Sequence, residues 1–337
     1  MIIKLILTIF CWLAVLPIVY GFNFGTDYNI FIILLYASLL FIMFMFSRFT
    51  TKFIICILFS ATYLILKELP SEDNLWKAGN FFIIFSAFLP SLWLLRSTAI
   101  TMPSVEKTQH LLSKLASSKI LSGIQVTSHV LGGVLNIGTF PLLSAVIPKN
   151  AKYKMRQISG EAAIRGMNTA VLWSPFFVSF AVGQLYLPSQ SAWLGIAFGL
   201  LVAFLFNLIS IRFLIGRFTL NYLFEAVSCV KPIFPRLLIL SISVLAVGQI
   251  FNKTALNAIV IVIPILVVIQ MLRRPETTKL IISNLNNLIL KSGDEMLLIS
   301  VSMFLGSILS GSVEIQNFIS NNIGNNLPFW AMIILLP

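Results

Sequence analysis

Long runs of apolar residues without a charge recur along the entire chain, and this pattern constrains the fold more than any other feature. The chain is 58% hydrophobic and only 10% charged. A helix of about 20 apolar residues is long enough to cross a bilayer. We therefore predict an all-α polytopic membrane protein, with apolar segments at 2–20, 28–46, 52–66, 80–95, 120–147, 169–187, 192–211, 236–252, 255–272, 296–319 and from about residue 329 onward.

The two ends of the chain carry separate expectations. Lys4 and the run Leu5–Val19 resemble a secretory signal, but no small-x-small cleavage motif follows, so we predict a retained membrane helix. The apolar run at the other end stops before it is long enough to span. We therefore expect the sequence to be truncated at its C-terminus.

The segment Ile120–Ile147 is long enough to span a membrane, yet its centre is a poor continuous helix. Three glycines and a proline fall within Gly132–Pro141, and these residues weaken or break the helical hydrogen-bond ladder. We predict a cytoplasmic re-entrant hairpin that turns around Leu135–Thr139. The alternatives are a kinked helix whose glycines allow close packing, and a helix lying on the membrane surface.

The distribution of basic residues favours the hairpin. If the N-terminus is cytoplasmic and 120–147 re-enters, 20 of the 23 Lys and Arg residues face the cytoplasm, and the exceptions are Lys67, Lys77 and Lys253. If 120–147 spans, 8 face the cytoplasm and 15 lie outside. The positive-inside rule prefers the first arrangement. It predicts a multi-pass protein with a cytoplasmic N-terminus, and it explains the net charge of +12 without a nucleic-acid partner. We expect the protein to lie in the inner (cytoplasmic) membrane of a bacterium.

The hairpin tip is the predicted binding site. The free N–H groups of the second half-helix, which would begin near Thr139, favour an anion. The free carbonyls at the end of the first half-helix, near Gly132, favour a small cation. Asn136 and Thr139 add side-chain oxygens on either side of Gly138. This arrangement predicts a small anionic substrate coupled to Na⁺ or H⁺, with no other cofactor.

Further residues are predicted to lie near the tip. His129, in the first half-helix, is a candidate for a proton or substrate contact, or for a bond to a neighbouring carbonyl. Ser174 and Pro175 lie in the middle of the predicted helix 169–187, where the proline would produce a kink. The predicted set of substrate- or ion-binding residues is Asn136, Gly138, Thr139, His129, Ser174 and Pro175, with no catalytic residue and no metal ligand.

The order of the segments predicts two series of three helices with opposite orientation, which an inverted repeat requires. The predicted organisation is an additional N-terminal helix at 1–27; a first repeat at 28–211, made of scaffold helices at 28–95, an interfacial arm at 103–118, the hairpin at 120–147 and helices at 169–187 and 192–211; an amphipathic linker at 212–235; and an incomplete second repeat at 236–337.

This order of elements resembles the ion transporter superfamily, which includes the divalent anion:sodium symporters and related carboxylate permeases. The resemblance lies in the arm Pro103–Ser118, the hairpin Ile120–Ile147 and the kinked span Thr169–Leu187. The symporters carry Ser-Asn-Thr at each hairpin tip. Here the tip has Asn136 and Thr139 separated by two residues, without the serine. The resemblance implies a homodimer with an elevator motion and a second hairpin beyond the end of this sequence.

The function predicted from these observations is secondary active transport of a small organic anion. The alternatives are a membrane-embedded enzyme of envelope polysaccharide or glycolipid synthesis, and a non-transporting membrane subunit. Such enzymes need a sizeable extracytoplasmic loop, and the predicted outside loops are short. The sequence has no Walker A motif, H-E-x-x-H motif, nucleophile elbow or Cys/His cluster, so ATP-driven transport and metal-dependent hydrolysis have no support.

Overall fold

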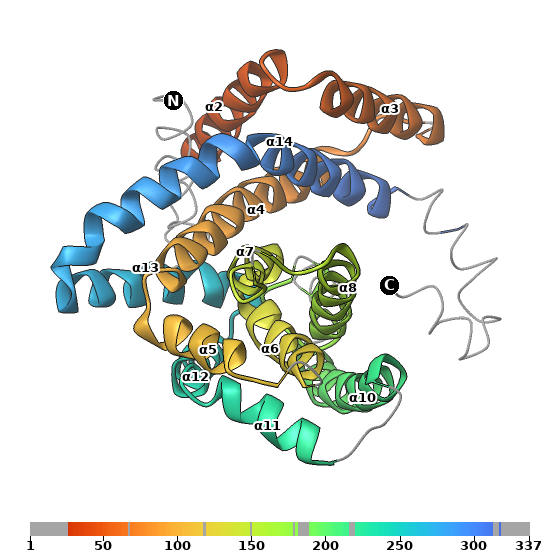
Figure 1. Ribbon diagram of the computed structural model, residues 1–337. Helices are drawn as coiled ribbons and strands as arrows, with labels where there is room; N and C mark the ends of the chain where they lie inside the picture. The colour runs from red at the N-terminus through yellow and green to blue at the C-terminus, as the bar shows by residue number, and fades with distance from the viewer. Residues whose placement is uncertain are drawn as a thin grey trace. The chain divides into compact units, whose positions relative to one another are not determined.

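The computed structural model describes residues 26–66, 68–116, 119–148, 150–177, 179–180, 189–215, 220–312 and Asn317 (Figure 1). Helices make up most of these residues, and there is no strand among them. The all-α class predicted from the sequence is therefore confirmed. The predicted segments 2–20 and from about 329 lie outside the described residues. The inverted repeat and the re-entry into a membrane stay predictions.

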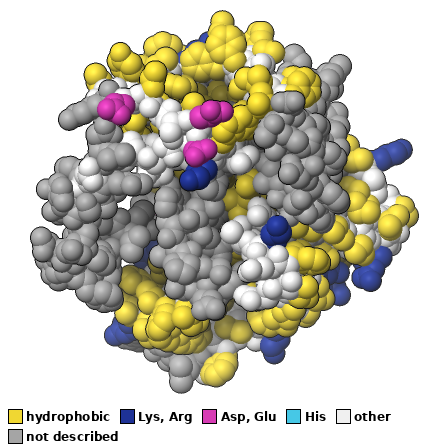
Figure 2. Space-filling model, turned by 180° about the vertical axis from the view of Figure 1, so that it is seen from behind, with side chains coloured by type: hydrophobic (Ala, Val, Ile, Leu, Met, Phe, Trp, Pro, Cys, Tyr) yellow, Lys and Arg dark blue, Asp and Glu magenta, His cyan; other side chains and the backbone are white. Residues whose placement is uncertain are grey.

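Apolar helices of membrane length are present in the described part of the chain. Three are long and apolar enough to cross a bilayer, at Leu194–Phe213, Ala255–Arg273 and Gly293–Ser310. The helices Asn221–Val230 and Phe234–Ile250 meet at a bend of 69° and form a fourth span if they cross together. On the face of the molecule shown in Figure 2, hydrophobic side chains cover much of the described surface, and charged side chains are fewer. These features indicate a membrane protein.

The chain packs into two compact units, which are described separately. The first comprises Met1–Pro90 and Ser283–Pro337, and the second comprises Ser91–Ile282. Helices α4 (Glu72–Ala99) and α14 (Thr278–Ser310) each begin in one unit and end in the other. The predicted repeat boundaries at 28–211 and 236–337 do not coincide with this division.

The first unit contains α2 (Thr26–Met45), α3 (Phe49–Ile65) and the larger parts of α4 and α14. The Tyr36 hydroxyl lies 3.4 Å from the Ser300 hydroxyl, and Arg48 pairs with Asp294 at 3.4 Å. Helix α14 is continuous over 33 residues, so the apolar segment predicted to begin at residue 296 is part of a longer helix that begins at Thr278. The polar residues between Thr278 and residue 296 include no proline, and a helix tolerates them at modest energetic cost.

The second unit contains α5 (Pro103–Ser113), α6 (Ile120–Leu135), η1 (Asn136–Gly138), α7 (Thr139–Ser144), α8 (Tyr153–Ala170), α10 (Ser189–Ile215), α11 (Leu220–Val230), α12 (Phe234–Ile250), α13 (Ala255–Arg273) and η2 (Pro275–Thr277). It is built around α6, which packs against α8, α10 and α11 (Figure 1). Pro103 occupies the first turn of α5, where its missing N–H removes no helical hydrogen bond.

Glycines allow α6 and α8 to approach closely. A methyl group placed on Gly132 would lie 3.2 Å from the Cα of Met167, and one on Gly133 would lie 2.7 Å from the Trp173 ring. A methyl group on Gly166 would lie 2.9 Å from the backbone nitrogen of His129. These contacts are tighter than packed carbon atoms normally allow. Gly132 and Gly133 therefore allow close packing, which is the role that the alternative of a kinked helix gives to the glycines.

The chain after α8 departs from the prediction. Helix α8 ends at Ala170 and residues 171–177 form turns, so the predicted kinked helix at 169–187 is wrong over this stretch. Ser174 precedes Pro175, and the residue before a proline is disfavoured in helical conformation. The turn also packs on α10, because a methyl group on Gly199 would lie 2.7 Å from the carbonyl carbon of Leu172. Residues 178 and 181–188 lie outside the described part.

Candidate functional site

The helix that begins at Ile120 is interrupted at Asn136, where the sequence predicts the break. Asn136 has φ 53° and ψ −132°, a backbone conformation that side chains with a Cβ rarely adopt. Residues 136–138 form a 3₁₀ turn before α7 begins at Thr139. The chain therefore breaks within the predicted Gly132–Pro141 region, although α6 continues through Gly132 and Gly133 and ends at Leu135.

The chain reverses after this break. Ile120, Ile124, Leu143 and Val146 belong to one buried hydrophobic cluster, so the returning segment packs along the first turns of α6. The Gln109 side-chain amide of α5 also donates to the Leu142 carbonyl at 2.8 Å. However, α7 has six residues, fewer than the half-helix that the sequence predicts. A helix this short has only a small dipole, which removes the predicted basis for an anion at its N-terminus.

The carbonyl groups predicted to bind a cation near Gly132 are engaged in hydrogen bonds. The backbone N–H of Asn136 donates to the Gly132 carbonyl. The Ser174 hydroxyl donates to the Gly133 carbonyl, and its oxygen accepts from the Phe176 N–H at 3.2 Å. Ser174 therefore ties the 171–177 turn to α6, and Pro175 beside it is buried. The structure does not support a cation site formed by these two carbonyls.

His129 lies within a partly buried polar network between α6, α8 and α10. Its Nε2 accepts from the Trp173 indole N–H at 3.2 Å, and its Nδ1 lies 3.0 Å from the Thr169 hydroxyl. An indole nitrogen can only donate, so the ring is a neutral tautomer with its proton on Nδ1. The Thr169 hydroxyl donates to the Gly166 carbonyl at 2.8 Å and accepts from Nδ1–H. Both ring nitrogens are therefore occupied by protein groups.

Asn207 of α10 joins this network to the middle of α6. Its amide nitrogen donates to Thr169 at 2.8 Å, and its amide oxygen accepts from Gln125 at 3.0 Å. The Ser210 hydroxyl donates to the Gln125 oxygen at 3.3 Å. The buried amides of Gln125 and Asn207 satisfy each other, as buried amides must, and the partly buried Thr169 accepts a further bond from Asn207. The network is thus a connection between three helices and was not identified as such from the sequence.

The predicted tip residue Gly138 lies beside an arginine that the sequence analysis did not assign to the site. A methyl group on Gly138 would lie 2.6 Å from the Arg96 Cδ, so the arginine side chain passes directly over Gly138. Thr139 next to it is fully buried, and its hydroxyl has no hydrogen-bond partner among the described residues. The sequence analysis counted Arg96 only among the basic residues that set the membrane orientation. Its position next to an apolar segment could have identified it as a candidate site residue.

A cavity of about 350 Å³ opens beside the end of α6, between α4, α12 and α13. Leu131, Val134 and Leu135 contribute its α6 wall. Three arginines also line it, namely Arg236 of α12 and Arg273 and Arg274 at the end of α13, and its described lining residues include no Asp or Glu. We call this space the arginine cavity. None of the six predicted site residues lines it.

Two side chains show how the polar part of the arginine cavity is arranged. Arg236 donates to the hydroxyl of the buried Ser104 of α5 at 2.6 Å, which holds its guanidinium in place. The amide nitrogen of Gln270 is buried and has no hydrogen-bond partner among the described residues. Neither Arg273 nor Arg274 forms an ion pair within this part of the chain. The cavity thus offers donors that no acceptor in the described part of the chain uses.

No protein-family model, curated protein or solved structure matches the chain. The resemblance to the ion transporter superfamily therefore stays a prediction. Among the described residues there is also no group of three or more His, Cys, Asp or Glu side chains that could hold a metal ion.

The conformation of Asn136 gives a test of its role. Replacing Asn136 with glycine should raise the free energy of unfolding by about 1 kcal/mol, because glycine adopts a positive φ without strain. Replacing it with valine should lower the unfolding free energy by a similar or larger amount. Thermal unfolding in detergent micelles measures both changes. A loss of stability in Asn136→Gly would mean that the side chain, and not the backbone conformation, matters at this position.

Proposed function

We propose that this chain is a secondary active carrier that moves a small organic anion with a partly apolar body across a membrane. The observation that carries the proposal is the arginine cavity, whose walls are apolar and whose charged groups are all cationic. Ligand cavities typically have volumes of about 300–1,000 Å³, and this cavity lies within that range. Its chemistry matches an anion better than a cation or a neutral polar molecule.

The guanidinium groups would supply the recognition of charge. Arginine remains protonated at physiological pH and binds carboxylates through paired hydrogen bonds. The apolar walls lower the local dielectric constant, which strengthens the attraction between a guanidinium and an anion. The unpartnered Gln270 amide adds a further donor at the same cavity. Leucine and isoleucine side chains would contact the apolar body of the ligand.

The position of the cavity supports transport over simple binding. Leu135, the last residue of α6, lines the cavity and directly precedes the break at Asn136. Transporters of many folds place their substrates at interrupted helices, because irregular backbone at membrane depth is tolerated where it faces a cavity. The finer parts of the proposal rest on charge distribution and on the resemblance alone: coupling to Na⁺ or H⁺, a homodimer, the bacterial inner membrane and a cytoplasmic N-terminus.

Uptake into proteoliposomes tests the proposal. The full chain would be assayed with radiolabelled succinate, benzoate and octanoate, which differ in charge and apolar area. We expect accumulation of at least one anion. The double substitution Arg273→Gln and Arg274→Gln should lower that uptake by about tenfold or more, because each lost charged hydrogen bond contributes about 1.5–3 kcal/mol. Dependence on an imposed Na⁺ or pH gradient would identify the coupling ion.

Lys279→Gln is the matched control, because it removes a positive charge from an exposed position on α14 outside the cavity. Uptake by this variant should equal that of the unmodified protein. Equal uptake by the double arginine variant would show that the arginine cavity is not the substrate site. No uptake of any of the three anions above that of empty liposomes would reject the transport proposal for this class of substrate. That result would favour the alternatives of an enzyme or a non-transporting subunit.

A further inference from the structure

A second cavity lies between α6, the returning segment 140–148 and α8, away from the arginine cavity. Its volume is about 540 Å³. The walls are mainly aliphatic and aromatic, and are formed by Ile124, Phe140, Leu143, Ile147, Ala163 and Ile164. We call this space the α8 cavity. Such walls suit a hydrocarbon chain, since each buried methylene group contributes about 0.8 kcal/mol.

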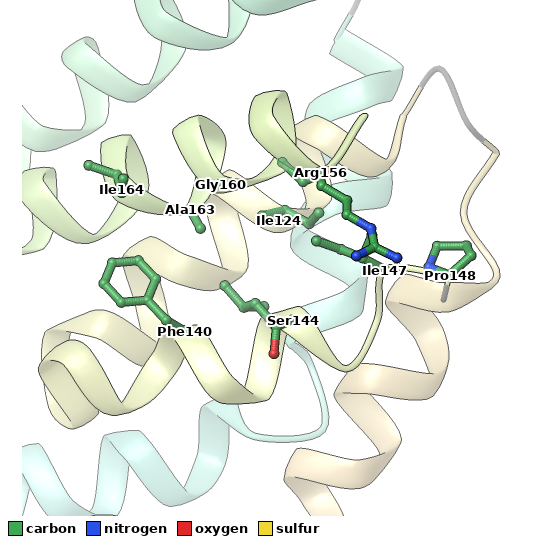
Figure 3. Close-up of a pocket in the computed structure, with 11 residues that line it drawn as sticks. Ile124, Phe140, Ser144, Ile147, Pro148, Arg156, Gly160, Ala163 and Ile164 are labelled. Carbon is green, nitrogen blue, oxygen red and sulfur yellow. The ribbon is translucent and has the colours of Figure 1, made fainter. Parts of the chain in front are cut away.

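One end of the α8 cavity is basic. Figure 3 shows Arg156 beside Ile147 and Pro148, while Phe140 and Ile164 lie toward the opposite end. The described residues that line the cavity include no Asp or Glu. The stretch 150–155, which includes the start of α8, adds the exposed Lys152 and Lys154 and contains no acidic residue. The cavity therefore combines a long apolar wall with a cationic end.

A buried hydroxyl inside the cavity wall points to a missing hydrogen-bond partner. Ser159 lines the cavity and its side chain is only 1% exposed. Its hydroxyl has no partner among the described residues. A buried hydroxyl without a partner costs about 1–3 kcal/mol, and a ligand with an oxygen acceptor at this point would remove that cost. Gly160 next to it leaves open space, because a methyl group added there would meet nothing within 4 Å.

We propose that the α8 cavity binds an anionic phospholipid, with one acyl chain along the apolar wall and the phosphate at Arg156. Ser159 donates a hydrogen bond to an ester oxygen near the headgroup. A phospholipid fits better than a water-soluble ligand because the cavity opens among exposed apolar side chains such as Ile164, which is 49% exposed. Basic residues at the edge of an apolar site are typical of anionic lipid recognition. This inference does not depend on the proposed transport function.

The bound lipid would connect the returning segment to α8. Phe140, Leu143 and Ile147 contribute one wall, and Ala163 and Ile164 contribute another. Any ligand that binds the folded chain alone stabilises it in proportion to its concentration and affinity. Occupancy should therefore raise the thermal unfolding temperature of the full chain.

The experiment compares the full chain in micelles supplemented with phosphatidylglycerol or with phosphatidylcholine. We expect phosphatidylglycerol to raise the unfolding temperature clearly and phosphatidylcholine to raise it less. The affinity for phosphatidylglycerol, from titration of this shift or from native mass spectrometry, should fall about tenfold in Arg156→Gln. Lys154→Gln removes the same charge from an exposed position on the same helix that does not line the cavity, and should change the affinity by less than about twofold.

A second variant tests the apolar wall. Gly160→Phe fills the open space beside Gly160 and should remove binding of both lipids, while helical content stays unchanged. Equal stabilisation by both lipids, or equal affinity loss in Arg156→Gln and Lys154→Gln, would overturn the proposal. Stabilisation by inorganic phosphate alone, with no added effect of an acyl chain, would overturn it too and identify a free-phosphate site. Arg156 is exposed, so its variant keeps the test decisive if Gly160→Phe does not fold.

Discussion

Gly166→Ala is expected to destabilise the protein by about 3 kcal/mol or more, which is at the upper end of overpacking effects. Gly166 of α8 faces the backbone of α6. An added methyl group would collide with the Gln125 carbonyl oxygen and would lie 2.9 Å from both the His129 nitrogen and the Ser128 Cβ. Backbone atoms cannot rotate away as a flexible side chain can. The two helices would have to separate, which would also stretch the hydrogen bond between Ser128 and the Ala163 carbonyl.

Gly160→Ala in the same helix is the control for this substitution. It carries the same change in helix propensity, which favours alanine by about 1 kcal/mol, but its methyl group meets nothing within 4 Å. We expect Gly160→Ala to be neutral or slightly stabilising. Thermal and denaturant unfolding in micelles, followed by circular dichroism, measures both variants. Similar stability in the two variants would contradict the close packing of α8 on α6.

Asn207→Leu is expected to lower the free energy of unfolding by about 2 kcal/mol, although leucine has nearly the same shape and is more apolar. Asn207 is 7% exposed and connects Gln125 of α6 to Thr169 of α8. The substitution leaves the Gln125 amide nitrogen without its best acceptor inside an apolar helix bundle. A buried polar group that loses its partner keeps its full desolvation cost.

Ser210→Ala is the matched control, because it removes a longer bond of 3.3 Å to the same glutamine. We expect a loss below about 1 kcal/mol, measured by the same unfolding assay. A double variant with Gln125→Leu should recover much of the stability lost in Asn207→Leu, since both polar partners are then absent. If Asn207→Leu alone is stabilising, the three-helix network does not contribute to stability as the hydrogen bonds indicate.

Part of the fold could be predicted because it depends on local chemistry. The apolar runs predicted membrane-length helices, and the structure contains them at Ala255–Arg273 and within Ser189–Ile215. Pro103 marked the start of α5, and the glycines around Asn136 marked the break after α6. Each of these features is decided by a few neighbouring residues.

The candidate site was predicted less well because it depends on contacts between distant segments. His129 and Ser174 were placed near the hairpin tip, and both do lie at the α6–α8 packing, but their polar atoms are occupied by Trp173, Thr169 and the Gly133 carbonyl. The residues that form the arginine cavity come from four helices spread over more than half of the chain. The sequence around Arg236 or Arg273 does not distinguish these arginines from arginines that only determine the membrane orientation of the chain.

The sequence by itself determined that this is a helical membrane protein, and that the helix beginning at Ile120 cannot continue through Asn136–Pro141. Hydropathy and backbone conformation are properties of short segments, so they can be read without knowing what those segments touch. Only the tertiary structure decided which groups remain available for a ligand. It showed that the carbonyls and the imidazole near the predicted tip are already hydrogen-bonded. It also showed that Arg236, Arg273 and Arg274 line the same mainly apolar cavity. Whether a polar group is satisfied depends on its neighbours in space, and those neighbours are set by the packing of helices far apart in the chain.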